Sequence, residues 1–177
     1  MGRPSLTGGR QTFTYFPGPI GLPNEAAPRI LNKSLRLTAD IEVPEAGVEG
    51  MIVTHGGLVG GYGLYVRDGK PTFVYNNLAL ERVTLTGREP LPKGKVRLAV
   101  DFAYNGGAGE RGKGAAVTMM VNGTKAAEGQ LSRTIPLQIS LGEGLDVGMD
   151  VGSAVDFTYQ LPFTFTGEIE KVTVELR

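Results

Sequence analysis

The chain contains no cysteine, no tryptophan and one histidine among its 177 residues. Without cysteine it can form no disulfide, no thiolate metal site and no cysteine nucleophile. A single histidine, His55, cannot make a two-histidine metal site, and a Ser-His-Asp triad would have to use it. The composition therefore excludes most common catalytic and metal centres, and we expect no catalytic residue, metal or cofactor in this chain.

Net charge and long apolar segments are also lacking. Lys plus Arg and Asp plus Glu both number 18, so the formal net charge is zero and no general attraction to nucleic acid or anionic membrane arises. No apolar run approaches the ~20 residues that cross a bilayer. The first residues are not followed by the apolar stretch of an export signal. We therefore expect neither a nucleic-acid nor a membrane partner.

Glycine and proline, in contrast, are abundant, with 27 and 11 residues, and both disfavour helix interiors and mark turns. Residues 34–43 alternate apolar and polar side chains, which predicts a strand with one face on a core. Residues 95–104 repeat the pattern. Asp68-Gly69 and Asn122-Gly123 predict two-residue hairpin turns, because type I′ turns need positive φ at both central positions.

The remaining pattern predicts about ten to twelve strands at short spacings and no convincing helix, which is typical of a β-sandwich or jelly roll. Residues 18–32 are rich in proline and predict a long loop over a sheet. We expect an all-β, antiparallel β-sandwich forming a single domain, residues 1–177, with a short flexible lead-in at about residues 1–9. Further strands are expected at residues 11–16, 48–54, 62–66, 71–75, 80–85, 115–121, 125–131, 134–140 and 163–176, the last with a bulge near Glu170-Lys171.

Aromatic and amide side chains near the first hairpin are the candidate ligand-binding residues, because sugar recognition uses such groups. The candidates are His55, Tyr62, Tyr65, Asn76 and Asn77. The alternative is structural, with His55 capping a strand end and the tyrosines packing in the core or across strands.

Acidic residues near the C-terminal third offer a second possibility. Asp146, Asp150 and Asp156 with Glu143 could hold Ca²⁺ through oxygen ligands, but their spacing does not fit an EF-hand loop. We expect a solvated loop there. No close carboxylate pair stands out, so a glycoside hydrolase is not indicated.

Ordered segments along nearly the whole chain form a recognisable series. They include Arg3-Pro-Ser-Leu-Thr7, Tyr15-Phe-Pro-Gly18, Thr38-Ala-Asp-Ile-Glu-Val43, His55-Gly-Gly57, Gly60-Gly-Tyr62, Asp68-Gly-Lys70, Phe102-Ala-Tyr104 and Asp146-Val-Gly148. The series resembles the C-terminal region of bacterial arylsulfatases of the large sulfatase family.

In that family, catalysis rests on a Cys or Ser in a C/S-x-P-S/A-R motif, converted to formylglycine beside a Ca²⁺ in a separate α/β domain. Only Arg3-Pro-Ser5 comes near the motif here, and it lacks the order and context. The resemblance therefore implies a non-catalytic accessory domain that packs on a sulfatase catalytic domain, in cis or in trans, with Ca²⁺ only in that partner. Such docking predicts an exposed apolar patch. A periplasmic or secreted location is implied by the resemblance alone.

Two further segments, Gly63-Leu-Tyr-Val66 with Phe73-Val-Tyr75 and the ending Phe165-Thr-Gly-Glu-Ile169, resemble the concanavalin A-like and laminin-G type of sandwich. That fold hosts many functions. It implies the alternative hypothesis, a free-standing carbohydrate-binding module with a glycan partner. This alternative requires a concave face with at least two exposed aromatic side chains.

Overall fold

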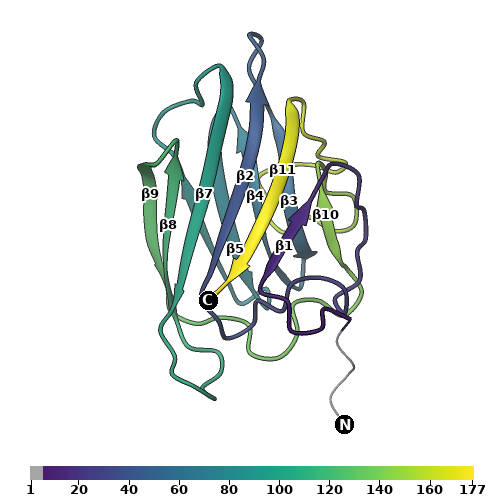
Figure 1. Ribbon diagram of the computed structural model, residues 1–177, viewed down its shortest axis with the longest axis vertical. Coiled ribbons are helices and arrows are strands. Elements are labelled where there is room, and N and C mark those ends of the chain that lie inside the picture. Colours follow the sequence, from purple (N-terminus) through teal and green to yellow (C-terminus); the bar gives the residue numbers. More distant parts are fainter. Residues whose placement is uncertain (1–5) are drawn as a thin grey trace.

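Eleven strands and no helix make up the described part of the computed structural model, residues 6–177 (Figure 1). The strands pair antiparallel into two sheets that pack face to face, so the predicted all-β sandwich is confirmed. Residues 1–5, which hold half of the expected lead-in and most of the segment Arg3–Thr7, lie outside the described part. Residues 6–9 form a turn. Nothing among residues 6–177 is a helix long and apolar enough to cross a membrane.

The two sheets differ in size. The six-stranded sheet has the order β1 (Thr12–Tyr15), β11 (Glu168–Leu176), β2 (Leu35–Val43), β7 (Gly94–Tyr104), β8 (Ala115–Val121) and β9 (Thr124–Leu131). The five-stranded sheet has the order β10 (Leu145–Val147), β3 (Gly50–Gly57), β4 (Gly60–Arg67), β5 (Lys70–Asn77) and β6 (Glu81–Thr86).

The core lies between the sheets and follows the alternation of the sequence. In β2 every second residue from Leu35 to Val43 is buried, and the residues between them are less buried or exposed, as predicted. Leu98 of β7 and Leu64 of β4 are fully buried in the same cluster. Burying one such side chain stabilises a fold by roughly 1.5–3 kcal/mol, so this alternation dominates the choice of register.

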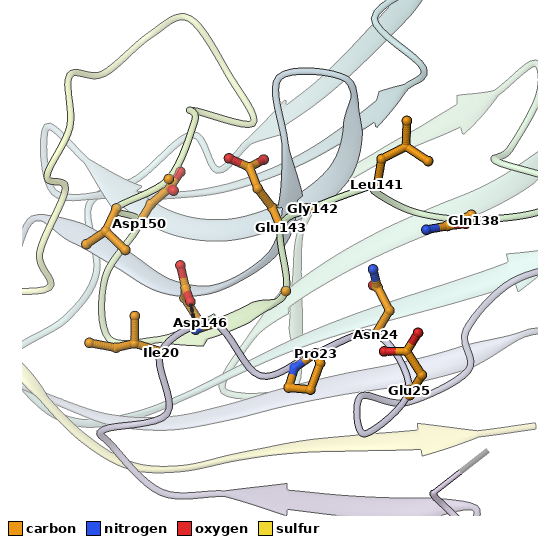
Figure 2. Close-up of a pocket in the computed structure, with 15 residues that line it drawn as sticks. Ile20, Pro23, Asn24, Glu25, Gln138, Leu141, Gly142, Glu143, Asp146 and Asp150 are labelled. Atoms are coloured by element: carbon orange, nitrogen blue, oxygen red, sulfur yellow. Dashed lines mark hydrogen bonds between the residues drawn. The ribbon is translucent and has the colours of Figure 1, made fainter. Parts of the chain in front are cut away.

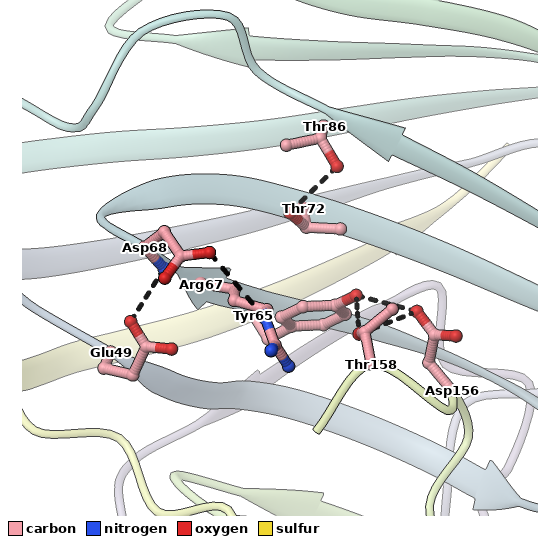
Figure 3. A network of polar contacts seen from close by, with 8 residues as sticks. All are labelled: Glu49, Tyr65, Arg67, Asp68, Thr72, Thr86, Asp156 and Thr158. Carbon is pink, nitrogen blue, oxygen red and sulfur yellow. Dashed lines mark hydrogen bonds and ion pairs between the residues drawn. The ribbon is translucent and has the colours of Figure 1, made fainter.

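Both predicted hairpin turns are present. Asp68 and Gly69 have φ values of 52° and 72°, and Asn122 and Gly123 have φ values of 50° and 81°. Positive φ at both central positions is the type I′ conformation, which Asp-Gly and Asn-Gly adopt at low cost. The carboxylate of Glu49 accepts a hydrogen bond from the Asp68 N–H at 2.8 Å, which further fixes the first turn (Figure 3).

One sequence expectation about strands is wrong, and one strand was missed. Residues 134–140 form no strand, because Pro136 interrupts the pairing and Ile135 and Ile139 are buried without a ladder. The short strand β10 was not expected, since three residues are too few to show an alternation. The predicted bulge in the last strand is confirmed between Ile169 and Lys171, although β11 begins only at Glu168.

The outer face of the five-stranded sheet is covered by the chain itself. A second apolar cluster joins Met51, Tyr65 and Val74 of this face to Val155 and Tyr159 of the segment 148–165. We call this segment the covering segment. Because it packs on the outer face, β3, β4 and β5 are buried on both faces.

The loops gather at the two ends of the sandwich. One end holds the segments 58–59, 78–80, 105–114 and 132–144 together with the later part of segment 16–34, whose first residues run down the side of the sandwich, and lies at the bottom of Figure 1. We call it the loop end. The opposite end holds the shorter turns 44–49, 68–69, 87–93 and 122–123.

Candidate functional site

All five candidate ligand-binding residues are buried, and they do not form one site. The exposed fractions are 1% for His55, 3% for Tyr62, 1% for Tyr65, 0% for Asn76 and 7% for Asn77. The rings of His55 and Tyr62 meet edge to face at 5.9 Å between the sheets. Tyr65 points to the opposite face, under the covering segment. Their contact with a ligand therefore stays a prediction.

Tyr65 and Asn76 have clear structural contacts. The Tyr65 hydroxyl donates to the Asp156 carboxylate at 2.8 Å and lies 3.0 Å from the Thr158 hydroxyl, which ties the covering segment to β4 (Figure 3). The Asn76 amide donates to the carbonyls of Gly57 and Leu58 at 2.8 and 3.0 Å, and its oxygen accepts from the Ala79 N–H. Asn76 thus joins the β3–β4 turn to the β5–β6 turn.

His55 is the candidate that lies nearest to open space. Its Nε2 is 2.6 Å from Oδ1 of Asn24, whose Nδ2 donates to the Ser140 carbonyl at 3.0 Å. Because the Asn24 oxygen must accept, His55 donates from Nε2 and keeps a lone pair on Nδ1. Nδ1 has no hydrogen-bond partner among residues 6–177. Burial lowers the pKa of His55 to about 4, so the ring is neutral at pH 7.

Two adjoining pockets form a groove at the loop end. They share Asn24, Glu25 and Gln138, and their volumes are about 330 Å³ and 480 Å³. The smaller one, the acidic pocket, is lined by Glu143, Asp146 and Asp150 (Figure 2). The larger one, the basic pocket, is lined by Arg29, Lys33 and Arg111, by His55 and by the apolar residues Pro28, Ile30, Leu137 and Ile139.

The aspartates of the acidic region are buried, so the expectation of a solvated loop is wrong. Asp146 accepts the Gly21 N–H, Asp150 accepts the Tyr159 O–H, and Asp156 accepts the Tyr65 O–H. Desolvation is the main cause that raises the pKa of Asp150 to about 6, and the nearby charges of Asp146 and Glu143 contribute to this rise. Desolvation likewise raises the pKa of Asp146. Asp146 is thus held by the loop 16–34, whereas Asp150 and Asp156 belong to the covering segment and are buried as it packs on the sheet.

Glu143 also holds the covering segment. Its carboxylate accepts hydrogen bonds from the N–H and the hydroxyl of Ser153, and that hydroxyl in turn accepts from the Leu58 N–H at 2.8 Å. In residues 6–177 no group of three or more His, Asp or Glu side chains is arranged to hold a metal ion. Asp150 is only 1% exposed, so it is poorly placed to act on a substrate.

The wall of the basic pocket is fixed by Asn32. This residue has a φ of 57°, an uncommon conformation that asparagine tolerates better than most residues. Its amide donates to the Pro136 carbonyl at 2.9 Å, and its oxygen accepts the Gly112 N–H at 2.8 Å. One side chain therefore joins the loops 16–34, 105–114 and 132–144, which carry the pocket's side chains.

Tyr104 supports the same wall. Its hydroxyl lies 3.0 Å from the Glu110 carbonyl and accepts the Lys113 N–H at 3.1 Å, so it anchors the loop on both sides of Arg111. Tyr104 is half-buried, as is Tyr15, whereas Tyr62, Tyr65, Tyr75 and Tyr159 are buried. The exposed aromatic side chains Phe16 and Phe157 line neither the acidic nor the basic pocket, so the described residues show no concave face of the kind that the carbohydrate-binding alternative requires.

Apart from His55 and the acidic residues Glu143, Asp146 and Asp150, the residues of the groove were not among the sequence candidates. Asn24, Arg29, Arg111 and Gln138 lie in loops without periodicity, so no strand pattern singles them out. Loop length was an available signal, because a loop longer than about 12–15 residues in a compact domain is usually functional. The proline-rich segment 16–34 fits that description.

A group of exposed apolar side chains lies at the same end of the molecule. Leu58 and Val59 stand on the β3–β4 turn, Leu78 and Leu80 on the β5–β6 turn, and Phe157 on the covering segment. Arg82 links them, because its guanidinium lies 4.0 Å from the centre of the Phe157 ring and donates to the Leu58 carbonyl. We call these five residues the apolar patch. The exposed apolar surface that docking predicts is thus present.

No family model matches the chain, and no curated protein matches it. Solved structures do match. The CBM40 domain of Ruminococcus gnavus IT-sialidase superposes with a TM-score of 0.58 at 15% identity, over 94% of this chain and 90% of that one. Domains LG4-5 of the mouse laminin α1 chain give 0.54 at 12% identity, over 94% of this chain and 39% of that one.

The chain has a concanavalin and laminin-G-like β-sandwich. A native heptameric SAP-like pentraxin from Limulus polyphemus adds a TM-score of 0.50 at 14% identity, over 93% of this chain and 76% of that one. The CBM40 domain bound to α2,6 sialyllactose also matches, at 0.55 and 14% identity, over 81% of this chain and 76% of that one. At such identities the likeness establishes the fold alone. No sulfatase is among the similar structures reported.

Proposed function

We propose that this chain is a carbohydrate-binding module that holds a glycan in the groove formed by the acidic and basic pockets, and not on the concave aromatic face that the sequence led us to require. The observation that carries this proposal is the groove's construction: two adjoining polar pockets whose walls are held by hydrogen bonds between three loops. Their volumes, about 330 and 480 Å³, fall within the usual range of ligand pockets. A wall that is already ordered loses less entropy when a ligand binds.

The structural neighbours support a binding role. The CBM40 domain, similar to this chain over most of its length, has been solved with sialyllactose bound. The carboxylates of Glu143, Asp146 and Asp150 take part in internal hydrogen bonds, which favours binding over hydrolysis. The amide of Gln138, which lines both pockets and is labelled in Figure 2, suits a sugar hydroxyl group because an amide both donates and accepts.

A glycan array followed by calorimetry tests this proposal. Gly142 lines the acidic pocket, and a side chain there meets no atom within 4 Å at its Cβ, so Gly142→Trp should fill the groove without disturbing the fold. Ala46→Trp, at an exposed position of the opposite end, is the matched control. We expect glycan binding to be lost in the first variant and kept in the second. Absence of any glycan ligand, or full binding by Gly142→Trp, would overturn the proposal.

The accessory role on a sulfatase is the second candidate, and the apolar patch is the observation that favours it. Leu80 is 84% exposed and Phe157 is 70% exposed. Exposed apolar patches of this kind often mark protein–protein contact sites. The test is to read the coding sequence on the 5′ side of this segment and to measure association with any sulfatase catalytic domain found there. Association that Leu80→Asp abolishes would support docking, and its absence would reject it.

A further inference from the structure

The basic pocket concentrates positive charge that the protein does not neutralise. Arg29 and Lys33 come from the loop 16–34 and Arg111 comes from the loop 105–114, and all three are exposed. None of them takes part in an ion pair within residues 6–177, whereas other cations do, such as Arg97 with Asp40 at 2.6 Å. Three cations around one pocket repel each other, and an anion among them removes that cost.

Charge is also segregated along the groove. The carboxylates of Glu143, Asp146 and Asp150 lie in the acidic pocket, while the basic pocket contains the three cations and one carboxylate, that of Glu25, at the boundary. The whole chain has a formal net charge of zero, so this separation is local. A bound molecule is therefore oriented, with any negative group in the basic pocket and its neutral hydroxyl groups towards the acidic one.

The basic pocket also offers apolar surface. Leu137, which is 69% exposed, and the side chains of Ile139 and Pro136 line it beside the cations. A sugar ring has one apolar face and a polar rim, so it can place that face on Leu137 while its charged substituent meets an arginine. Guanidinium groups bind carboxylate and sulfate oxygens through two parallel hydrogen bonds, which gives orientation as well as affinity.

From these observations we infer that the glycan is anionic, and that its carboxylate or sulfate group lies in the basic pocket among Arg29, Lys33 and Arg111. This inference rests on the proposed function, since it names the class of glycan that the groove takes. Asn32 is essential to it, because its hydrogen bonds to Pro136 and Gly112 hold together the two loops that carry Leu137 and Arg111.

Calorimetry with three related probes tests the inference: lactose, sialyllactose with its carboxylate, and lactose sulfate. We expect at least one charged probe to bind about tenfold more tightly than lactose, the order of magnitude of a charge-assisted hydrogen bond at a partly exposed site. That affinity should fall as NaCl is raised, because salt screens charges at the surface. The stronger of the two charged probes identifies whether carboxylate or sulfate is preferred.

Substitutions of the three cations test where the anionic group of the glycan binds. Arg29→Gln, Lys33→Gln and Arg111→Gln should each weaken the charged probe several-fold and leave lactose binding unchanged. Arg88→Gln and Lys95→Gln, exposed cations at the opposite end, should change neither. Equal binding of lactose and the charged probes, or charged-probe binding that the three variants leave intact, overturns the inference and leaves the proposed function standing. Failure of every glycan to bind overturns the proposed function itself.

Discussion

Lowering the pH should destabilise this fold through a single ring, that of His55. In the unfolded chain the histidine pKa is near 6.5, and in the folded protein burial lowers it to about 4. Between these values the unfolded state binds a proton that the folded state does not, so stability falls as the pH falls. Each pH unit in this window contributes about 1.4 kcal/mol, so at pH 4.5 the loss is about 2.5 kcal/mol.

Urea unfolding of the wild type and of His55→Gln at pH 7.0 and pH 4.5 measures this effect. Both proteins share every carboxylate, so the two pH responses differ mainly by the histidine. We expect the wild type to lose about 2.5 kcal/mol more than the variant. Since the chain has one histidine, its ring signals in an NMR titration are unambiguous. A folded-state pKa near 6.5, or equal pH responses of the two proteins, would refute the reasoning.

Two further substitutions test the loop end. In thermal melts, Asp150→Asn should stabilise the protein by about 1 kcal/mol at pH 8 and have little effect near pH 3.5. The reason is that the raised pKa of Asp150, about 6, marks a carboxylate whose charged form is disfavoured by folding. A variant that is less stable than the wild type at pH 8 would contradict this. Asn32→Ala should lower the free energy of unfolding by about 2 kcal/mol and speed amide hydrogen exchange at Gly112, because it removes hydrogen bonds to two loops. Unchanged exchange at Gly112 would show that Asn32 does not hold the wall of the basic pocket.

The sheets could be predicted from the sequence because their signals are local. Alternation in residues 34–43 and 95–104 fixes which side chains face the core, and Asp68-Gly69 and Asn122-Gly123 fix two turns. The prediction fails where residues are buried outside the hydrogen-bonded strands. Ile135 is buried because its N–H binds the Tyr75 hydroxyl at 2.9 Å, a contact between residues 60 positions apart, and no pattern around Ile135 encodes it.

The candidate site was harder to predict for the same reason. The aromatic content near the first hairpin correctly indicates packing, since Tyr62 and Tyr65 are buried on opposite faces of β4. The groove instead depends on contacts between distant loops. Asn32 bonds to residues 104 and 80 positions away, and Asn24 bonds to Ser140 across 116 positions. The sequence alone shows that the loops are polar, but it does not show which loops are in contact.

A β-sandwich has few places for a ligand, and this chain covers one of them. The covering segment occupies the outer face of the five-stranded sheet, where Tyr65 is engaged by Asp156. On the outer face of the six-stranded sheet several strand charges form ion pairs, such as Asp40 with Arg97 and Asp101 with Arg36. The loop end differs, because three cations there remain without ion-pair partners in residues 6–177 beside an ordered pocket. A preformed pocket lined by cations without ion-pair partners suits an anionic ligand. We therefore expect binding at the loop end and not on the outer face that the covering segment occupies.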